Sequence, residues 1–339
     1  MTSNNSLEEI LSEYNSLGIN QQLDYEKFYL YSIITHSTAI EGSTVTEIEN
    51  QLLFDEGISA KKPIKEQLMN LDLKSAYEKA FDYAKNHTDI TIELLCNLAS
   101  ILMKNTGSEY KTIAGTFSSA KGELRLLNVS AGRGGKSYLA WQKVETKLQQ
   151  VCDYLNQQRK KINSTDIQEI YKLSFEAHYL LVSVHPWADG NGRMSRLVMN
   201  IIQKEFAVVP SIVKKESRAE YIQSLANSQE KDDSSEFLDF MFTHHKNNIL
   251  QQIKEFISSN KNDTLNLKDD TLNDTLSLTE KEKAVLGLIE NDLKITGDSI
   301  VEKTGFSRPT VMRAIKSLKE KNILERLGSK KTGSWKVNK

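Results

Sequence analysis

The feature that most constrains the fold is a glycine-rich segment that separates two helical patterns. Residues 185–196 read HPWADGNGRMSR. Apolar residues between Ile167 and Val182 recur with the helical period, and RLVMNIIQKEF continues as a second helix beyond Gly192. Pro186 disfavours helical geometry at the residue before it, so the first helix should end near His185. The sequence therefore predicts a helix–loop–helix within a region of about 250 mostly helical residues.

Several residues of this segment suit the binding of a phosphorylated ligand. Gly190 and Gly192 allow a ligand to approach the backbone closely, and they lie at a helix N-terminus, which attracts phosphate. Asn191 can donate to a phosphate oxygen from its side chain. Arg193 and Arg196 share one helix face and can both reach toward a polyphosphate. This combination predicts an anion site at the start of the second helix.

The same segment also contains a base and a carboxylate. His185 can act as a general base near neutral pH, and Trp187 should anchor the loop in the core. Asp189 is the only carboxylate of the segment, and beside phosphates it is a natural Mg²⁺ ligand. Together these groups suit phosphoryl or nucleotidyl transfer, in which positioning and charge neutralisation supply most of the catalysis. The alternative is a glycine-rich turn with scattered surface arginines.

The segment resembles the HPFx(D/E)GNGRxxR signature of the Fic family, with Trp187 where Phe is usual. A looser likeness extends over residues 7–246. The resemblance implies an all-helical core that binds ATP and Mg²⁺ and transfers AMP to a Ser, Thr or Tyr hydroxyl of a protein. It implies that His185 deprotonates the hydroxyl and that Asp189 holds Mg²⁺.

The resemblance also implies roles for the remaining residues of the segment. Gly190, Asn191 and Gly192 would hold the α- and β-phosphates, and Arg193 and Arg196 would bind the outer phosphates. Kinase-like members of the wider family carry Lys at the position of Gly192. The glycine therefore favours AMP transfer over phosphorylation.

A second motif, STAIEG at residues 37–42, ends a helix expected to begin near Tyr25. A carboxylate at a helix C-terminus opposes the helix dipole, so Glu41 should have a cationic partner elsewhere. The motif resembles the (S/T)xxxE(G/N) inhibitory motif of Fic proteins. Carried over, Glu41 would pair with Arg196 and displace the γ-phosphate, and Ser37 would steady the inhibitory helix. The alternative is a helix end with a glycine stop.

Residues 122–141 differ from their helical surroundings. The letters GELRLLNV predict a strand, GRGGKS a loop, and YLAW a short strand or helix start. The resemblance makes this hairpin a flap that holds the target peptide by strand addition. The expected docking residues are Asn128, Val129, Ser130, Gly132, Gly135 and Tyr138. Residues 130–137 also approach a P-loop, although Ser130 stands where that motif needs glycine and no Walker B strand is evident.

We predict an N-terminal helical region at 1–105, a catalytic core at 106–255, a low-complexity linker at 256–277 and a winged helix domain at 278–339. Residues 307–339 contain ten basic and two acidic residues, a net charge of +8, although the whole chain carries −1. This asymmetry indicates a nucleic-acid-facing end or, alternatively, a protein-interaction module. The possible DNA contacts are Arg308, Arg313, Lys316, Lys330 and Lys331.

The composition limits the remaining choices. Cys96 and Cys152 form no disulfide framework or metal set and suit a reducing compartment. Neither a signal peptide nor an apolar run of ~20 residues is evident, so we expect a cytoplasmic protein with no membrane contact, and a homodimer. The expected class is all-α: a Fic core with a flap hairpin, followed by a winged helix-turn-helix.

Two functions follow from these patterns. The first is a protein adenylyltransferase that uses ATP and Mg²⁺ and is autoinhibited by Glu41. The alternative is a transcriptional regulator that acts through the winged helix, with the Fic domain as a nucleotide-sensing or de-AMPylating module.

Overall fold

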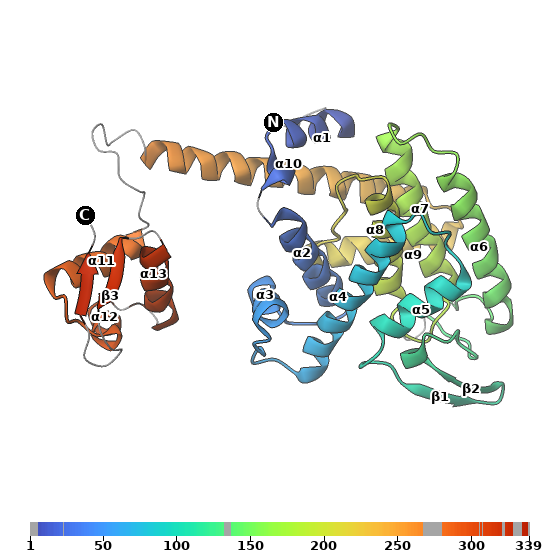
Figure 1. Ribbon diagram of the computed structural model, residues 1–339. Coiled ribbons are helices and arrows are strands. Elements are labelled where there is room, and N and C mark those ends of the chain that lie inside the picture. The colour runs from blue at the N-terminus through green and yellow to red at the C-terminus, as the bar shows by residue number, and fades with distance from the viewer. Residues whose placement is uncertain are drawn as a thin grey trace. The chain divides into compact units, whose positions relative to one another are not determined.

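The computed structural model describes residues 6–22, 24–131, 137–266, 280–304, 306, 308–320, 323–327 and 334–337. The chain divides into two compact units, Met1–Asn260 and Lys261–Lys339, and each is described by itself. Helices dominate both units (Figure 1). Among the residues that the structure describes, no helix has the length and apolar character needed to cross a membrane.

The first unit is a bundle of helices with one short hairpin. Its helices in chain order are α1 (Leu7–Ser16), α2 (Tyr25–Ile40), α3 (Glu47–Glu56), α4 (Ile64–Lys85), α5 (Ile92–Leu102), α6 (Val144–Arg159), α7 (Ile167–Val184), α8 (Asn191–Glu205), α9 (Arg218–Lys231) and α10 (Ser235–Asn266). Short 3₁₀ turns lie at Ile19–Gln21, Ser119–Lys121, Trp141–Lys143 and Lys215–Ser217.

Side-chain caps explain where several of these helices begin. Ser6 and Glu9 form a capping box at the start of α1, and Thr46 and Glu49 form another at α3. At α7, the Asp166 side chain accepts a hydrogen bond from the Glu169 backbone. Each cap pairs backbone N–H groups that the first helical turn leaves without partners. The Asp166 cap fixes the start of α7, which leads directly to the candidate site.

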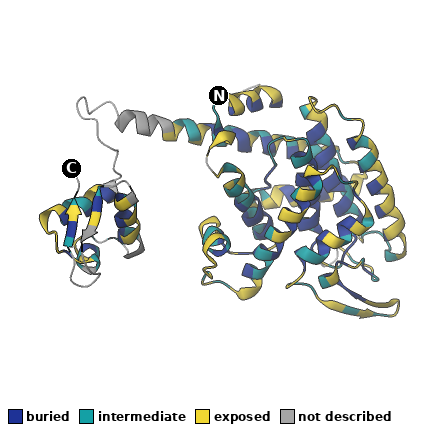
Figure 2. Cartoon of the chain, viewed as in Figure 1, coloured by how far each residue is buried: buried dark blue, intermediate teal, exposed yellow. Residues whose placement is uncertain are grey.

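The core of the first unit surrounds α7 and α8, which pack against each other. Helix α4 also packs on α8, and α6 packs on α7. Buried residues from these helices form one large apolar cluster, which includes Leu73, Leu181, Trp187 and Leu197. Figure 2 shows the buried residues on the inward faces of the bundle. The loop between α7 and α8 is thus held by the most tightly packed pair of helices.

The hairpin of the first unit is not where the sequence predicted it. Its strands are β1 (Glu109–Thr112) and β2 (Gly115–Ser118), which pair antiparallel with Tyr110 opposite Phe117. The two rings stack at 4.9 Å between centroids. The hairpin projects from the helical body (Figure 1), and its tip residue Ile113 is fully exposed.

The expected strand at 122–129 is wrong, because no strand forms there. The backbone of this segment turns inward, and the Arg125 N–H donates to the Pro186 carbonyl rather than to a neighbouring strand. Further along the chain, Ser130 and Ser137 form an isolated β-bridge. YLAW leads into a helix start, as one of the two expectations had it.

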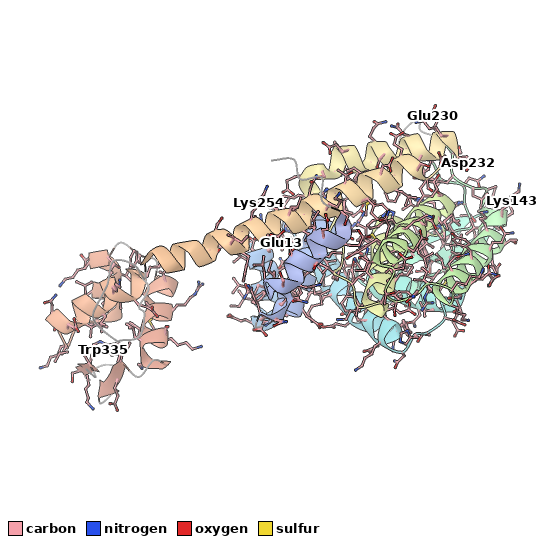
Figure 3. The ribbon with its side chains drawn as sticks, turned by 90° about the horizontal axis from the view of Figure 1, so that it is seen from above. Glu13, Lys143, Glu230, Asp232, Lys254 and Trp335 are labelled. Carbon is pink, nitrogen blue, oxygen red and sulfur yellow. The ribbon has the colours of Figure 1, made fainter. Side chains whose placement is uncertain are left out.

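The second unit contains α11 (Glu280–Asn291), α12 (Gly297–Thr304) and α13 (Arg308–Glu320), followed by the antiparallel strands β3 (Leu324–Leu327) and β4 (Ser334–Val337). Trp335, labelled in Figure 3, is buried in its core and donates from Nε1 to the Ile295 carbonyl at 3.1 Å. Helix α10, on which Figure 3 labels Lys254, continues to Asn266 and so through the first part of the predicted linker. The rest of that linker, residues 267–279, lies outside the described residues.

Candidate active site

His185 lies immediately after the last turn of α7. Its backbone is left-handed (φ 52°), which ends the helix at the residue before Pro186, as the sequence predicted. The ring is half-buried and stacks on Tyr138, with 3.9 Å between centroids and 18° between planes. Burial lowers the pKa of His185 to about 4, although the Val182 carbonyl opposes this; the positive charge of Arg125 lowers it further.

The protonation of His185 follows from these contacts. With so low a pKa the imidazole is neutral at pH 7. Its Nδ1 lies 3.3 Å from the Val182 carbonyl oxygen, which can only accept, so Nδ1 carries the proton. Nε2 is therefore the unprotonated nitrogen, and it can accept a proton from a hydroxyl group.

The loop after His185 is anchored from both sides. Trp187 is 1% exposed, and its Nε1 donates to the Gly122 carbonyl at 3.0 Å, so the expected anchor is present. The Asn191 amide binds both backbone groups of Trp187, accepting from N at 3.0 Å and donating to O at 2.8 Å. The Asn191 side chain thus shapes the loop, and its binding of phosphate stays a prediction.

Gly190 begins the turn into α8 and must be glycine. Its φ is 82°, and a Cβ there would come 2.8 Å from the Met103 sulfur. The next residues form the first turn of α8, whose backbone N–H groups have no partners within the helix. Such a turn attracts anions through its free donors and its dipole.

Arg193 lies in the first turn of α8 and is 3% exposed. Its Nη2 contacts the Met103 sulfur at 3.1 Å and lies 3.9 Å from Asp189. Its Nε and Nη1 have no hydrogen-bond partner. A buried cationic donor without a partner is costly, so this guanidinium is built to receive an anion.

Arg196 also lies buried on α8, but its donors are occupied. Nε donates to the Ser37 hydroxyl at 2.8 Å and Nη2 to the Ser37 carbonyl at 3.0 Å. Nη2 also pairs with Glu41 Oε1 at 2.6 Å. The Glu41–Arg196 ion pair that the resemblance implied is therefore present, whereas the contacts of Ser37 with Arg196 were not predicted. Burial opposes ionisation of Glu41, yet Arg196 outweighs it and holds the pKa of that carboxyl below its usual range.

Tyr221, on α9, is a further partner of Arg196, and no pattern in the sequence predicts this contact. Its hydroxyl accepts from Arg196 Nη1 at 3.3 Å and lies 2.8 Å from His178 Nε2. Because Arg196 can only donate, the hydroxyl proton of Tyr221 points to His178. His178 is fully buried, as expected for a packed core histidine. This chain of contacts fixes Arg196 from the side opposite Glu41.

The structure explains the presence of a glycine at position 192 differently from the family resemblance. A Cβ at this position would lie 2.7 Å from Glu41 Oε1 and 3.2 Å from Arg196 Nη1. Its backbone angle is ordinary, so the limit is space. Any side chain here would push the Glu41 carboxylate away from Arg196. The ion pair and the glycine are therefore parts of one arrangement.

Asp189 is the residue that could hold a metal ion together with substrate phosphates. Its side chain is 60% exposed, and only Oδ1 is engaged, accepting from the Gly190 N–H at 2.6 Å. In the described part of the chain, no cluster of three or more His, Cys, Asp or Glu side chains could hold a metal. One carboxylate beside phosphates fits Mg²⁺, which keeps several waters and needs few protein ligands.

Four of the six predicted docking residues lie in the described segments 128–130 and 137–138. Asn128 Oδ1 accepts from the Trp141 N–H at 3.0 Å, and the Val129 carbonyl accepts from the Tyr138 N–H at 3.0 Å. Ser130 joins the bridge to Ser137, and Tyr138 reaches His185. The other two docking residues, Gly132 and Gly135, lie outside the described residues.

The possible DNA-contacting residues belong to the second unit. Arg313 and Lys316 are exposed on α13, which begins at Arg308. The side chain of Arg308 lies outside the described residues, as do Lys330 and Lys331. Contact with DNA therefore stays a prediction.

The sequence reasoning also missed Arg125, which is 1% exposed and bonded to the backbone of His185. The only signal was a single arginine within the apolar run GELRLLNV. A buried guanidinium there was not foreseen because backbone carbonyl partners leave no mark in a sequence.

The fold and the site together define a helical protein in which a neutral histidine lies near buried arginine side chains that can bind an anion. Residues 89–203 match the family model described as Fic/DOC family. The chain is similar to protein adenylyltransferase fic-1 of Caenorhabditis elegans, with 26% identity over 295 residues that cover 85% of this chain and 53% of the relative.

Two further likenesses agree. Protein adenylyltransferase Fic of Drosophila erecta is 27% identical over 212 residues, which cover 59% of this chain and 37% of that protein. The chain thus spans about half the length, or less, of these curated relatives. A solved structure of a Fic-domain-containing signalling protein from Bacteroides thetaiotaomicron VPI-5482 is 18% identical, with a TM-score of 0.60 over 74% of this chain and 97% of that one. This likeness shows the fold.

Proposed function

We propose that this chain is a protein adenylyltransferase that transfers AMP from ATP to a hydroxyl group of a protein. The observation that carries the proposal is Arg193, whose Nε and Nη1 are buried without partners at the first turn of α8. A polyphosphate would supply the missing acceptors. His185, with Nε2 free, lies at the other end of the same loop. The names of the relatives support AMP transfer as the reaction.

The reaction follows from this placement of a base and cations. His185 Nε2 takes the proton of the acceptor hydroxyl, whose oxygen forms a bond to the α-phosphorus of ATP. The bond from that phosphorus to the oxygen bridging to the β-phosphate breaks, and pyrophosphate leaves. Arg193 and the first turn of α8 stabilise the negative charge on the phosphates. Mg²⁺, held by Asp189, would neutralise further phosphate charge.

We further propose that the chain is autoinhibited. Glu41 binds Arg196, which the full nucleotide needs for its outer phosphates, so the carboxylate competes with the γ-phosphate for one guanidinium. The 2.6 Å ion pair and the close approach of Glu41 to Gly192 support this reading. ATP can bind in the productive position only when Glu41 leaves, and the cost of breaking the pair sets the degree of inhibition.

Labelled ATP tests the reaction type. The Glu41→Gly variant is incubated with a protein extract and ATP labelled at either the α- or the γ-phosphate. We expect protein-bound label from the α-labelled nucleotide only, and its loss in Glu41→Gly/His185→Ala. Lys136→Ala in the same background is the matched control for the P-loop alternative and should retain transfer. Label from the γ-phosphate, or activity that depends on Lys136 and not on His185, would refute the proposal.

The second unit supports a separate proposal. Three helices followed by an antiparallel strand pair is the order of a winged helix domain, and α13 exposes Arg313 and Lys316. We infer that this unit binds duplex DNA through phosphate contacts. Its role beside the Fic domain would be to place the enzyme or to regulate transcription.

A further inference from the structure

We propose that Arg125 is a positioning residue that ties the two described sides of the docking loop, residues 127–131 and 137–139, to the backbone of the general base. The inference rests on the function proposed above and names a residue that the Fic signature does not contain. The Arg125 guanidinium donates to protein carbonyls. It acts through the groups that it holds.

The hydrogen bonds of Arg125 converge from two directions. Nε donates to the His185 carbonyl at 2.7 Å, and Nη2 lies 3.5 Å from the Val184 carbonyl. Nη1 donates to the Leu127 carbonyl at 2.7 Å, and Nη2 donates to the Leu139 carbonyl. One guanidinium thus joins the end of α7 to both sides of the loop base. The Arg125 backbone N–H adds a bond to the Pro186 carbonyl at 3.0 Å.

The chemistry of these partners explains why an arginine stands here. The carbonyls of residues 184 and 185 lie at the C-terminal end of α7, where the helix dipole favours a cation. The planar guanidinium presents donors in several directions, so it can bridge acceptors that lie on different segments. A lysine ammonium has three donors at one point and cannot span the same carbonyls. Arg125 is 1% exposed, so the loss of one of its hydrogen bonds leaves a buried polar group without a partner.

A second contact shows what this coupling would control. Tyr138 stacks on the His185 ring at 3.9 Å between centroids, and the next residue, Leu139, gives its carbonyl to Arg125. The guanidinium therefore positions the backbone of His185. It also positions Tyr138, the loop residue that stacks on the His185 ring. An acceptor peptide docked on this loop would be registered to His185 through the same group. Misplacement of reacting groups by about 1 Å costs on the order of 100-fold in rate.

Arg159 provides a matched control for burial and hydrogen bonding. It is buried on α6, donates from Nε to Glu205 at 2.7 Å and from Nη1 to Asn156 at 2.8 Å, and its Nη2 donates to the Thr88 carbonyl at 3.1 Å. These partners lie outside the candidate site. Substitution of Arg159 should therefore lower stability without altering His185.

The test compares Arg125→Lys and Arg125→Gln with Arg159→Lys and Arg159→Gln, all in the full-length Glu41→Gly protein. We expect both Arg125 variants to lower kcat for AMP transfer on the order of 100-fold while the Kd for ATP stays that of the parent. Arg125→Lys should retain more activity than Arg125→Gln. The Arg159 variants should keep the parent kcat. Equal kcat in the Arg125 variants and the parent would overturn the proposal.

A second readout does not depend on activity. In isotope-labelled protein, the His185 imidazole signal is assigned by its loss in His185→Ala, and its chemical shift is followed against pH. Arg125→Gln removes a nearby positive charge, so the His185 pKa should rise, whereas Arg159→Gln should leave it unchanged. An unchanged His185 signal in Arg125→Gln would overturn the positioning role even if the parent transferred no AMP, in which case the proposed function alone would fail.

Unfolding is also a decisive outcome. If both Arg125 variants fail to fold under conditions in which both Arg159 variants fold, Arg125 is a structural residue and the proposal is refuted. If all four variants fold, the changes in kcat and in the His185 pKa described above decide whether Arg125 is a positioning residue.

Discussion

Removal of the Glu41 charge should strengthen ATP binding by an amount that the structure bounds. Arg196 is 3% exposed and Glu41 37%, with 2.6 Å between Nη2 and Oε1. At an effective dielectric constant of about 20, unit charges ~4 Å apart attract by about 4 kcal/mol. Desolvation of Arg196 and solvent screening of the partly exposed Glu41 remove much of this energy. We take about 1–3 kcal/mol as the coupling, which corresponds to roughly 5- to 150-fold in affinity.

The assay is calorimetric titration of ATP with Mg²⁺ into wild type, Glu41→Gln and Glu41→Gly. Both variants should bind ATP more tightly within that range, because each removes the carboxylate that occupies Arg196. Glu41→Gly should gain more, since it also frees the space beside Gly192. Glu26→Gln is the control: Glu26 lies on α2, the helix that ends next to Glu41, and the substitution breaks an exposed ion pair with Lys204 of α8 and should leave ATP affinity unchanged.

The salt dependence of the same titrations adds a check. A partly exposed ion pair weakens with ionic strength, so the difference between wild type and Glu41→Gln should shrink as salt is raised. ATP affinity that is the same in wild type, Glu41→Gln and Glu41→Gly would refute the reasoning, because Glu41 would then not compete for Arg196.

Three further predictions follow from other contacts. Gly192→Ala should raise basal ATP affinity by displacing Glu41, and a double-mutant cycle should find no such gain in the Glu41→Gly background; an equal gain there would place the effect elsewhere. His185 should titrate near pH 4. The free energy of unfolding should therefore fall as pH drops from about 6.5 toward 4, because the unfolded chain takes up a proton that the folded His185 does not. A midpoint near 6.5 in the chemical-shift titration would contradict the burial argument. Arg313→Ala should weaken duplex DNA binding. It should also reduce by about one the slope of the logarithm of the binding constant against the logarithm of salt concentration, and an unchanged slope would exclude a phosphate contact.

The helix–loop–helix could be predicted because each of its determinants is local. Pro186 ends one helix, and Gly190 lies at the start of the next. The caps of these helices and the burial of Trp187 follow from the same short stretch. Glu41 could be paired with Arg196 only through the family resemblance, because 155 residues separate them in the chain. Periodicity places each of them on a helix but says nothing about their distance.

The rest of the site depends on contacts that leave no sequence pattern. Arg125 binds backbone carbonyls, which every residue carries, so nothing in the sequence marks its partners. The segment 122–129, in which alternation predicted a strand, is instead irregular, and Gly122 and Arg125 are its buried residues. The true hairpin had a weaker signal in Tyr110 and Phe117, which lie on opposite sides of a short turn and stack in the structure. Tyr221 reaches Arg196 from α9 because of how the helices pack.

The burial of Arg193 also changes what the signature residues mean. From the sequence, Arg193 and Arg196 form an equivalent pair of phosphate clamps. In the structure, two nitrogens of Arg193 have no partner, whereas each nitrogen of Arg196 has at least one. The two arginines therefore differ in the present arrangement: one is open to an anion, and the other is occupied by Glu41 and Ser37.

The intact mass of a modified acceptor protein tests AMP transfer most directly. A protein captured as labelled by the Glu41→Gly variant is purified, and its mass is measured before and after incubation with that variant, unlabelled ATP and Mg²⁺. We predict a gain equal to one AMP group per modified hydroxyl, with none when His185→Ala is added to the variant. A gain equal to a phosphate group, or an AMP gain that persists without His185, would contradict the proposed reaction.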